Sequence, residues 1–217
     1  MVQVFLKKFL AAANYIIKGN FYSLRRGVIW PEEEYKRGML KRIQKIFQYD
    51  YFVETGTYYG GTPEKLRSYF KHIWTIELDD KLFTEAQQRL CQYNNIECIH
   101  GDSGVVLRWL IKKIDKPAIF FLDGHYSGSG TGQSENPIVK ELEAIGRSPV
   151  KTHVIVIDDA SSFNIKESGI ALSEVIRRIE EINRDYKIYF DYDMLFAIPS
   201  DEDRFFWRKI VYPVVIR

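Results

Sequence analysis

Acidic residues follow five short apolar runs of this chain, and their type and spacing point to a binding or catalytic site. The runs lead into these acids: Glu54, Glu77, Asp102, Asp123 and the pair Asp158–Asp159. Such runs are typical of buried parallel strands, and the ligand of an open α/β sheet lies outside the carboxyl ends of its strands. We therefore expect the acids to line one crevice, which favours a cationic ligand or a metal ion.

The turn after the first apolar run is rich in glycine. Residues 54–62 read Glu-Thr-Gly-Thr-Tyr-Tyr-Gly-Gly-Thr. Glycines let the backbone turn tightly and approach a ligand at the start of a helix. A dinucleotide fingerprint would read G-x-G-x-x-G, but here Thr57 and Tyr58 follow Gly56, and Glu54 would repel a phosphate. The turn therefore predicts a ligand other than a pyrophosphate.

Three of these acids follow the fourth and fifth apolar runs. Asp123 and the pair Asp158–Asp159 should converge, because the two runs are expected to be neighbouring strands. Close carboxylates repel one another unless they are protonated, paired or bridged by a cation. Oxygen ligands of this kind suit Mg²⁺, so the three aspartates are a candidate metal site. In the alternative, Asp123 contacts the ligand directly while Asp158 and Asp159 cap the following turn.

Strand and helix signals alternate along the chain and would position these acids. The predicted helix starts are Pro31, Thr62–Pro63, Asp79 or Asp80, Ser103 and Asn136–Pro137, and a last amphipathic helix carries apolar side chains from Leu172 to Ile182. Residues 187–190 and 194–198 break the alternation and predict an antiparallel hairpin. This pattern predicts an α/β fold with a doubly wound, mostly parallel sheet, a C-terminal hairpin and N-terminal helices.

Composition and charge are those of an ordinary globular domain. The chain has 217 residues, 46% hydrophobic and 28% charged, and its two cysteines form no disulfide framework, so we expect a cytoplasmic protein. Residues 1–45 hold ten Lys or Arg and three acids, a net charge of +7, which leaves −5 for the remainder of a chain of net charge +2. We therefore distinguish a basic helical segment, 1–48, from the domain, 49–217, on which it is expected to pack.

The acids and the glycine turn resemble the motifs of the class I S-adenosylmethionine-dependent methyltransferases over roughly residues 50–199. In that family an acid, one residue, a glycine, three residues and a second glycine form the first motif, which Glu54, Gly56 and Gly60 match. The resemblance implies a Rossmann-like, seven-stranded sheet, with Glu77 on the ribose hydroxyls and Asp102 near the adenine. The implied cofactor-binding residues are Glu54, Thr55, Gly56, Thr57, Tyr58, Gly60, Gly61, Thr62, Glu77, Leu78, Asp102, Ser103 and Asp123.

The later aspartates resemble those of the metal-dependent O-methyltransferases of the catechol and sugar types. That group has one aspartate after its fourth strand and an acidic pair after its fifth, as Asp123, Asp158 and Asp159 do here. The resemblance implies that Mg²⁺ binds the acceptor oxygen. The catechol enzymes carry a lysine where this chain has Tyr126, so we nominate His125 as the base, with Tyr126 orienting the acceptor.

The function expected from these motifs is methyl transfer from S-adenosylmethionine to a hydroxyl of a sugar, a glycan or a small metabolite. The net positive cofactor would be attracted by the acidic crevice. The alternatives are a nicotinamide-dependent oxidoreductase, which lacks its fingerprint here, and a cofactor-binding module without catalysis. A nucleic acid is not expected as partner, because residues 46–217 are acidic. The basic N-terminal helix is compatible with a weak membrane contact, and the apolar C-terminal residues with a homodimer.

Overall fold

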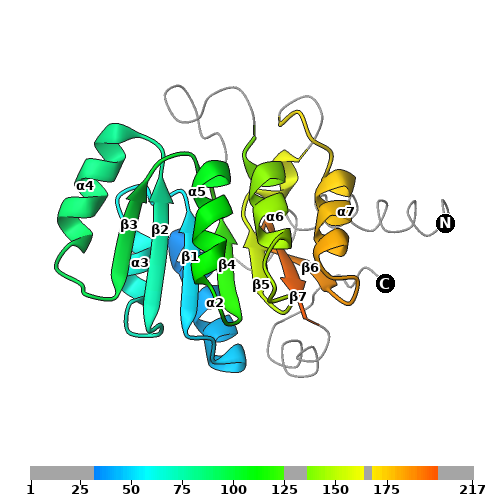
Figure 1. The fold of residues 1–217 in the computed structure, drawn as a ribbon, viewed down its shortest axis with the longest axis horizontal. Coiled ribbons are helices and arrows are strands. Elements are labelled where there is room, and N and C mark those ends of the chain that lie inside the picture. The colour runs from blue at the N-terminus through cyan, green and yellow to red at the C-terminus, as the bar shows by residue number, and fades with distance from the viewer. Residues whose placement is uncertain (1–31, 125–135, 164–167, 200–217) are drawn as a thin grey trace, which may run out of the picture.

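A seven-stranded sheet organises the chain in the computed structural model, which describes residues 32–124, 136–163 and 168–199 (Figure 1). The strand order is β3-β2-β1-β4-β5-β7-β6. The strands are β1 (Tyr51–Thr55), β2 (His72–Glu77), β3 (Ile96–His100), β4 (Ala118–Leu122), β5 (Val154–Ile157), β6 (Lys187–Asp191) and β7 (Met194–Ile198). The first five are parallel, and the order reverses between β1 and β4. The predicted doubly wound, Rossmann-like sheet is confirmed.

The predicted C-terminal hairpin is also confirmed. Strands β6 and β7 pair antiparallel, and β7 inserts between β5 and β6. Tyr192 and Asp193 form the tight connection and both have positive φ. The hairpin therefore brings residues near the end of the described chain beside β5, whose C-terminal acids are candidates for the site.

Helices cover both faces of the sheet. They are α2 (Glu32–Phe47), α3 (Gly61–Leu66), α4 (Asp80–Leu90), α5 (Ser103–Leu110), α6 (Ile138–Gly146) and α7 (Leu172–Ile182), with short 3₁₀ turns at Ile111–Lys113 and Ala160–Ser162. Helices α5, α6 and α7 lie on one face, and α2 and α3 lie on the other (Figure 1). Strands β4 and β5 are buried along their whole length, because both of their faces are covered.

Helix starts agree with the sequence pattern at two positions and correct it at two others. Asp79 caps α4, since its Oδ1 accepts hydrogen bonds from the backbone N–H groups of Lys81 and Leu82, and Asn136 Oδ1 accepts one from Ile138 N. Thr62 was predicted as the cap of α3, but the helix begins earlier, after Gly60 in the left-handed conformation. Ser103 was likewise predicted as a cap, but Asp102 caps α5 and Ser103 is its first residue.

Within the described residues, no helix is both long and apolar enough to cross a membrane. The N-terminal segment, 1–48, is described from residue 32 on, where α2 packs its apolar face on the sheet. Residues 1–31 and the C-terminal residues 200–217, to which the membrane and dimer expectations refer, lie outside the described part.

Candidate active site

The turn between β1 and α3 is held in an unusual backbone conformation at the carboxyl end of the sheet. Gly56, Tyr58 and Gly60 all have positive φ, at 83°, 51° and 75°. A Cβ on Gly56 would lie 2.5 Å from the backbone oxygen of Asp123, so only glycine fits there. The amides of Gly56 and Thr57 donate to the backbone oxygen of Ile76, at 2.9 and 3.2 Å. The turn is therefore hydrogen-bonded to the end of β2 and lies closely against the residue that follows β4.

Glu54 lies beneath this turn and is almost completely buried, with 2% of its surface exposed. Its Oε2 accepts a hydrogen bond of 2.6 Å from the Thr75 hydroxyl, which lies 2.7 Å from the Thr57 hydroxyl. Burial raises the pKa of Glu54 to about 8, against the lowering effect of the Thr75 hydrogen bond. Near neutral pH the carboxyl group is therefore mostly protonated, and an incoming cation would favour its ionised form.

Glu77, at the end of β2, binds the same turn through its carboxylate. Its Oε2 accepts a hydrogen bond from Tyr58 N at 2.8 Å, and its Oε1 accepts from Leu78 N and Asp79 N, both at 3.0 Å. Each oxygen of a carboxylate has two lone-pair positions, so Oε2 retains a position for a further donor. The side chains beside it are open to solvent, since Tyr58 is 61% exposed and Leu78 is 45% exposed. Glu77 thus fixes the turn and borders an open, apolar rim.

Asp102 occupies the next strand end, and part of its carboxylate has a structural role. Its Oδ1 accepts a hydrogen bond of 2.9 Å from Val105 N and caps α5. No hydrogen bond is assigned to its Oδ2 within the described residues, so that oxygen can contact a ligand such as the predicted adenine. The structure thus brings Glu54, Glu77 and Asp102 to the carboxyl ends of β1, β2 and β3, as predicted.

Asp123 and Asp158 follow the neighbouring strands β4 and β5, in the arrangement that the sequence predicted. Asp123 N donates to Thr55 O at 3.1 Å and Asp158 N donates to Leu122 O at 3.0 Å, which extends the pairing of the strands by one residue. Burial, followed by repulsion from Asp158, raises the pKa of Asp123 well above its usual range. Burial likewise raises the pKa of Asp158 to about 6, although Lys36 opposes the shift. Repulsion between the two carboxyl groups thus adds to the effect of burial at Asp123.

Lys36 of α2 supplies a cation to this pair, and the sequence analysis did not select it as a site residue. Its Nζ lies 2.5 Å from Asp158 Oδ2; Lys36 is 7% exposed and Asp158 is fully buried. The signal was present in the sequence, because Lys36 precedes Met39, Leu40 and Ile43 by three, four and seven residues. A lysine in the apolar stripe of a helix needs a buried partner.

The described residues do not fit the predicted Mg²⁺ site. No group of three or more His, Cys, Asp or Glu side chains within them is arranged to hold a metal ion. Asp158 is in contact with an ammonium group and has no exposed surface, whereas Mg²⁺ keeps several waters. Asp159 has a left-handed backbone, at φ 47°, and leads into the 3₁₀ turn. The assignment of Asp123, Asp158 and Asp159 as metal ligands is thus left without support from this geometry.

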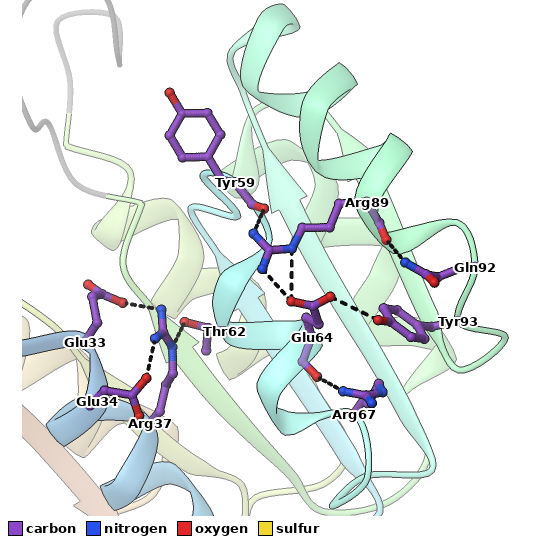
Figure 2. A network of polar contacts seen from close by, with 10 residues as sticks. All are labelled: Glu33, Glu34, Arg37, Tyr59, Thr62, Glu64, Arg67, Arg89, Gln92 and Tyr93. Carbon is purple, nitrogen blue, oxygen red and sulfur yellow. Dashed lines mark hydrogen bonds and ion pairs between the residues drawn. The ribbon is translucent and has the colours of Figure 1, made fainter.

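A network of polar contacts joins α2, α3 and α4 around the glycine turn (Figure 2). Arg37 of α2 forms ion pairs with Glu33 and Glu34 and donates a long hydrogen bond of 3.4 Å to Thr62. Arg89 of α4 binds Glu64 of α3 at 2.5 Å and donates to the backbone oxygen of Tyr59. The predicted cofactor residues Gly61 and Thr62 therefore lie at the start of α3, where this network holds the helix in place.

Glu141 of α6 is a second buried acid that sequence reasoning missed. It is fully buried, and within the described residues no hydrogen bond is formed by its carboxyl oxygens or by Thr55 Oγ1. Gly124 lies between them, since a Cβ there would be 3.3 Å from Thr55 Oγ1 and 3.4 Å from Glu141 Oε1. Burial raises the pKa of Glu141 to about 7, although the nearby Ser103 and Thr55 hydroxyls lower it. The predicted residues Thr55 and Ser103 thus face α6 beneath the turn.

The predicted catalytic base His125, and Tyr126 beside it, lie outside the described residues. Their roles therefore stay predictions. Asp123, the third predicted catalytic residue, lies where β4 ends, directly beneath Gly56.

The chain has the fold of solved S-adenosylmethionine-dependent methyltransferases. Among the similar solved structures is an O-methyltransferase from Bacillus cereus in complex with SAH, at a TM-score of 0.56 and 15% identity, covering 87% of this chain and 90% of the other. A second is the O-methyltransferase TomG from Streptomyces achromogenes, involved in tomaymycin synthesis and bound to SAM, at 0.51 and 17%, covering 87% and 89%.

A third similar structure is the N-methyltransferase NodS from Bradyrhizobium japonicum WM9 in complex with S-adenosyl-L-homocysteine, at a TM-score of 0.51 and 16% identity, covering 82% of this chain and 96% of the other. No family model and no curated protein sequence matches the chain. The fold is thereby shown, while the neighbours transfer methyl groups to different atoms.

Proposed function

We propose that this protein is an S-adenosylmethionine-dependent methyltransferase that methylates a hydroxyl group. The observation that carries the proposal is the pair of carboxyl groups at the glycine turn. Glu54 lies beneath the turn and Glu77 accepts a hydrogen bond from Tyr58 N within it. The ionised carboxyl groups would repel the pyrophosphate of a dinucleotide at such a turn, whereas a sulfonium and an ammonium group would favour the ionised form of Glu54.

Each strand end has a part in the proposed cofactor site. The free lone pair of Glu77 would accept from a ribose hydroxyl, and the exposed Leu78 and Tyr58 would cover the ribose and adenine. Asp102 would reach the adenine with the oxygen that does not cap α5. Asp123 would face the methionine end of the cofactor, because it lies directly against Gly56.

The proposed acceptor is a hydroxyl of a sugar, a glycan or another small metabolite. In the reaction an acceptor oxygen attacks the methyl carbon, the bond from that carbon to sulfur breaks, and S-adenosylhomocysteine leaves with the sulfur electron pair. The hydroxyl proton passes to a base, for which His125 is our candidate, with Tyr126 orienting the acceptor. No step is assigned to Mg²⁺, because Lys36 already contacts Asp158.

Titration calorimetry with S-adenosylmethionine, S-adenosylhomocysteine and NAD tests the cofactor assignment. We expect saturable binding of the first two and none of NAD. Glu77→Gln should weaken binding at least tenfold, because an amide cannot accept at both of its termini. Glu181→Gln, at an exposed position of α7, is the matched control and should bind as the wild type does.

Binding of NAD in place of S-adenosylmethionine would refute the proposal in favour of an oxidoreductase. If S-adenosylmethionine binds, a screen of hydroxylated sugars and phenols for S-adenosylhomocysteine release tests catalysis. Binding without turnover of any acceptor would support a binding module instead. An amine that turned over in place of a hydroxyl would correct the acceptor atom.

A further inference from the structure

We propose that the Lys36 ammonium takes the place of a divalent cation among the aspartates at the ends of β4 and β5, so that this chain needs no metal and Lys36 acts as a positioning residue. The inference rests on the proposed function, because it concerns the acceptor side of the same site. It departs from the metal site that the sequence had suggested for Asp123, Asp158 and Asp159.

The contact between Lys36 and Asp158 has the geometry of a built-in cation site. The two side chains meet at 2.5 Å, and neither is open to solvent, with 7% and 0% of their surfaces exposed. Asp158 Oδ1 has no hydrogen-bond partner within the described residues. A charge as buried as that of Asp158 requires a partner, and Lys36 provides it.

A hydrated Mg²⁺ ion would compete for the same position. Mg²⁺ binds carboxylate oxygens at about 2.0–2.1 Å and keeps several of its waters. Binding at Asp158 would require the ammonium to leave and the stem of Lys36 to withdraw from the apolar stripe that it shares with Met39 and Leu40. The ammonium and the metal ion are therefore alternatives at this carboxylate.

Neighbouring residues of α2 hold Lys36 in place from both sides. The Tyr35 hydroxyl donates to Asp191 Oδ2 at 2.5 Å, and its ring packs on Tyr192 with centroids 4.5 Å apart. Arg37 donates to Thr62 at the start of α3. Three consecutive residues thus contact the ends of β6 and β5 and the start of α3. The first turns of α2 therefore reach the carboxyl ends of β5 and β6.

Thermal unfolding of the cofactor-free protein with EDTA or with Mg²⁺ tests the inference, together with elemental analysis of the purified protein. In the wild type we expect substoichiometric metal and no saturable rise of the unfolding temperature with Mg²⁺. Lys36→Met keeps the apolar stem but removes the charge, and should lower the unfolding temperature by roughly 6–20 °C. Mg²⁺ should then raise it saturably, because Asp158 has lost the cation that contacts it.

Three further variants separate the charge effect from a packing effect. Lys36→Arg keeps the charge and should stay insensitive to Mg²⁺. Lys36→Met combined with Asp158→Asn should regain stability over Lys36→Met alone and lose the response to Mg²⁺. Lys45→Met, at an exposed position of the same helix, should behave as the wild type.

One equivalent of bound metal in the wild type, or saturable stabilisation of it by Mg²⁺, would overturn the inference even if Lys36→Met failed to fold. A Lys36→Met variant that folds but does not respond to Mg²⁺ would reduce Lys36 to a packing role. None of these measurements uses the cofactor, so they are independent of the calorimetry with S-adenosylmethionine. Failure of that calorimetry would instead refute the proposed function.

Discussion

Binding of the proposed cofactor should release a proton from Glu54. The pKa of Glu54 is raised to about 8, chiefly by burial, with smaller effects from Thr75, Glu33, Arg37 and Glu77 around it. Only about one tenth of the carboxyl groups are ionised at pH 7 in the free protein. A sulfonium and an ammonium group near Glu54 would favour the carboxylate and lower its pKa in the complex.

The size of the effect follows from the fraction of protein already ionised. The apparent dissociation constant is the intrinsic one divided by that fraction. At pH 7 the cost of ionising Glu54 is therefore about 1.4 kcal/mol. For each pH unit below 7, the affinity for the cofactor should fall roughly tenfold. Binding should tighten as the pH rises towards about 8 and level off above it.

Calorimetry between about pH 6 and 8, in two buffers of different ionisation enthalpy, measures both quantities. We expect a release approaching one proton per cofactor at pH 7, where Glu54 of the free protein is mostly protonated. Glu54→Gln keeps an acceptor for the Thr75 hydroxyl and serves as the control, since it retains any titration of the cofactor's own amino group. The reasoning is wrong if wild type and Glu54→Gln show the same proton release and the same pH dependence.

Three other outcomes follow from the structure. Gly56→Ala should cost several kcal/mol of stability and abolish cofactor binding, because its Cβ would lie 2.5 Å from a backbone oxygen. Gly169 is the control position: it also has positive φ, but a Cβ there would meet no atom of the described residues within 4 Å, so Gly169→Ala should cost only about 1 kcal/mol in denaturant titrations. Burial lowers the pKa of His153 from 6.5 to about 4, so the stability that its neutral form contributes is fully present above pH 6.5. As the pH falls from 6.5 towards 4, the free energy of unfolding should drop by about 1.4 kcal/mol per pH unit. Urea titrations of His153→Gln should not show this loss. Asp79→Ala should lower the free energy of unfolding by about 1 kcal/mol by removing the cap of α4, and equal stability of the variant in the same titrations would contradict that role.

The sheet could be predicted from sequence because its signals are local. Four of the five apolar runs are largely buried and the edge strand β3 is half-buried; each run leads to an acid, and parallel strands bring these ends to one edge. The starts of α3 and α5 were misplaced because Gly60 and Asp102 compete with a neighbouring Thr or Ser for the cap position, and only the backbone conformation decides between them.

The partners of the buried charges were not predictable in the same way. The approach of Lys36 to Asp158 and of Glu141 to Thr55 depends on how helices dock on the sheet, not on spacing along the chain. The spacing of Asp123, Asp158 and Asp159 did indicate that a cation lies beside them, and the sequence pattern was interpreted as a metal site. In the structure the cation beside Asp158 is the Lys36 ammonium group, from a helix that precedes the sheet.

The position of α2 also bears on the order in which the two halves of the crevice can form. The contacts that fasten the glycine turn join residues close along the chain, 19 positions apart for Tyr58 and Glu77 and 21 for Thr75 and Glu54. The contact of Tyr35 with Asp191 closes a loop of 156 positions. Closing a longer loop costs more chain entropy, so a contact between residues far apart along the chain forms later in folding. The half that would hold the cofactor can therefore assemble early, whereas the half facing the acceptor is completed only when α2 and the last two strands have reached the sheet.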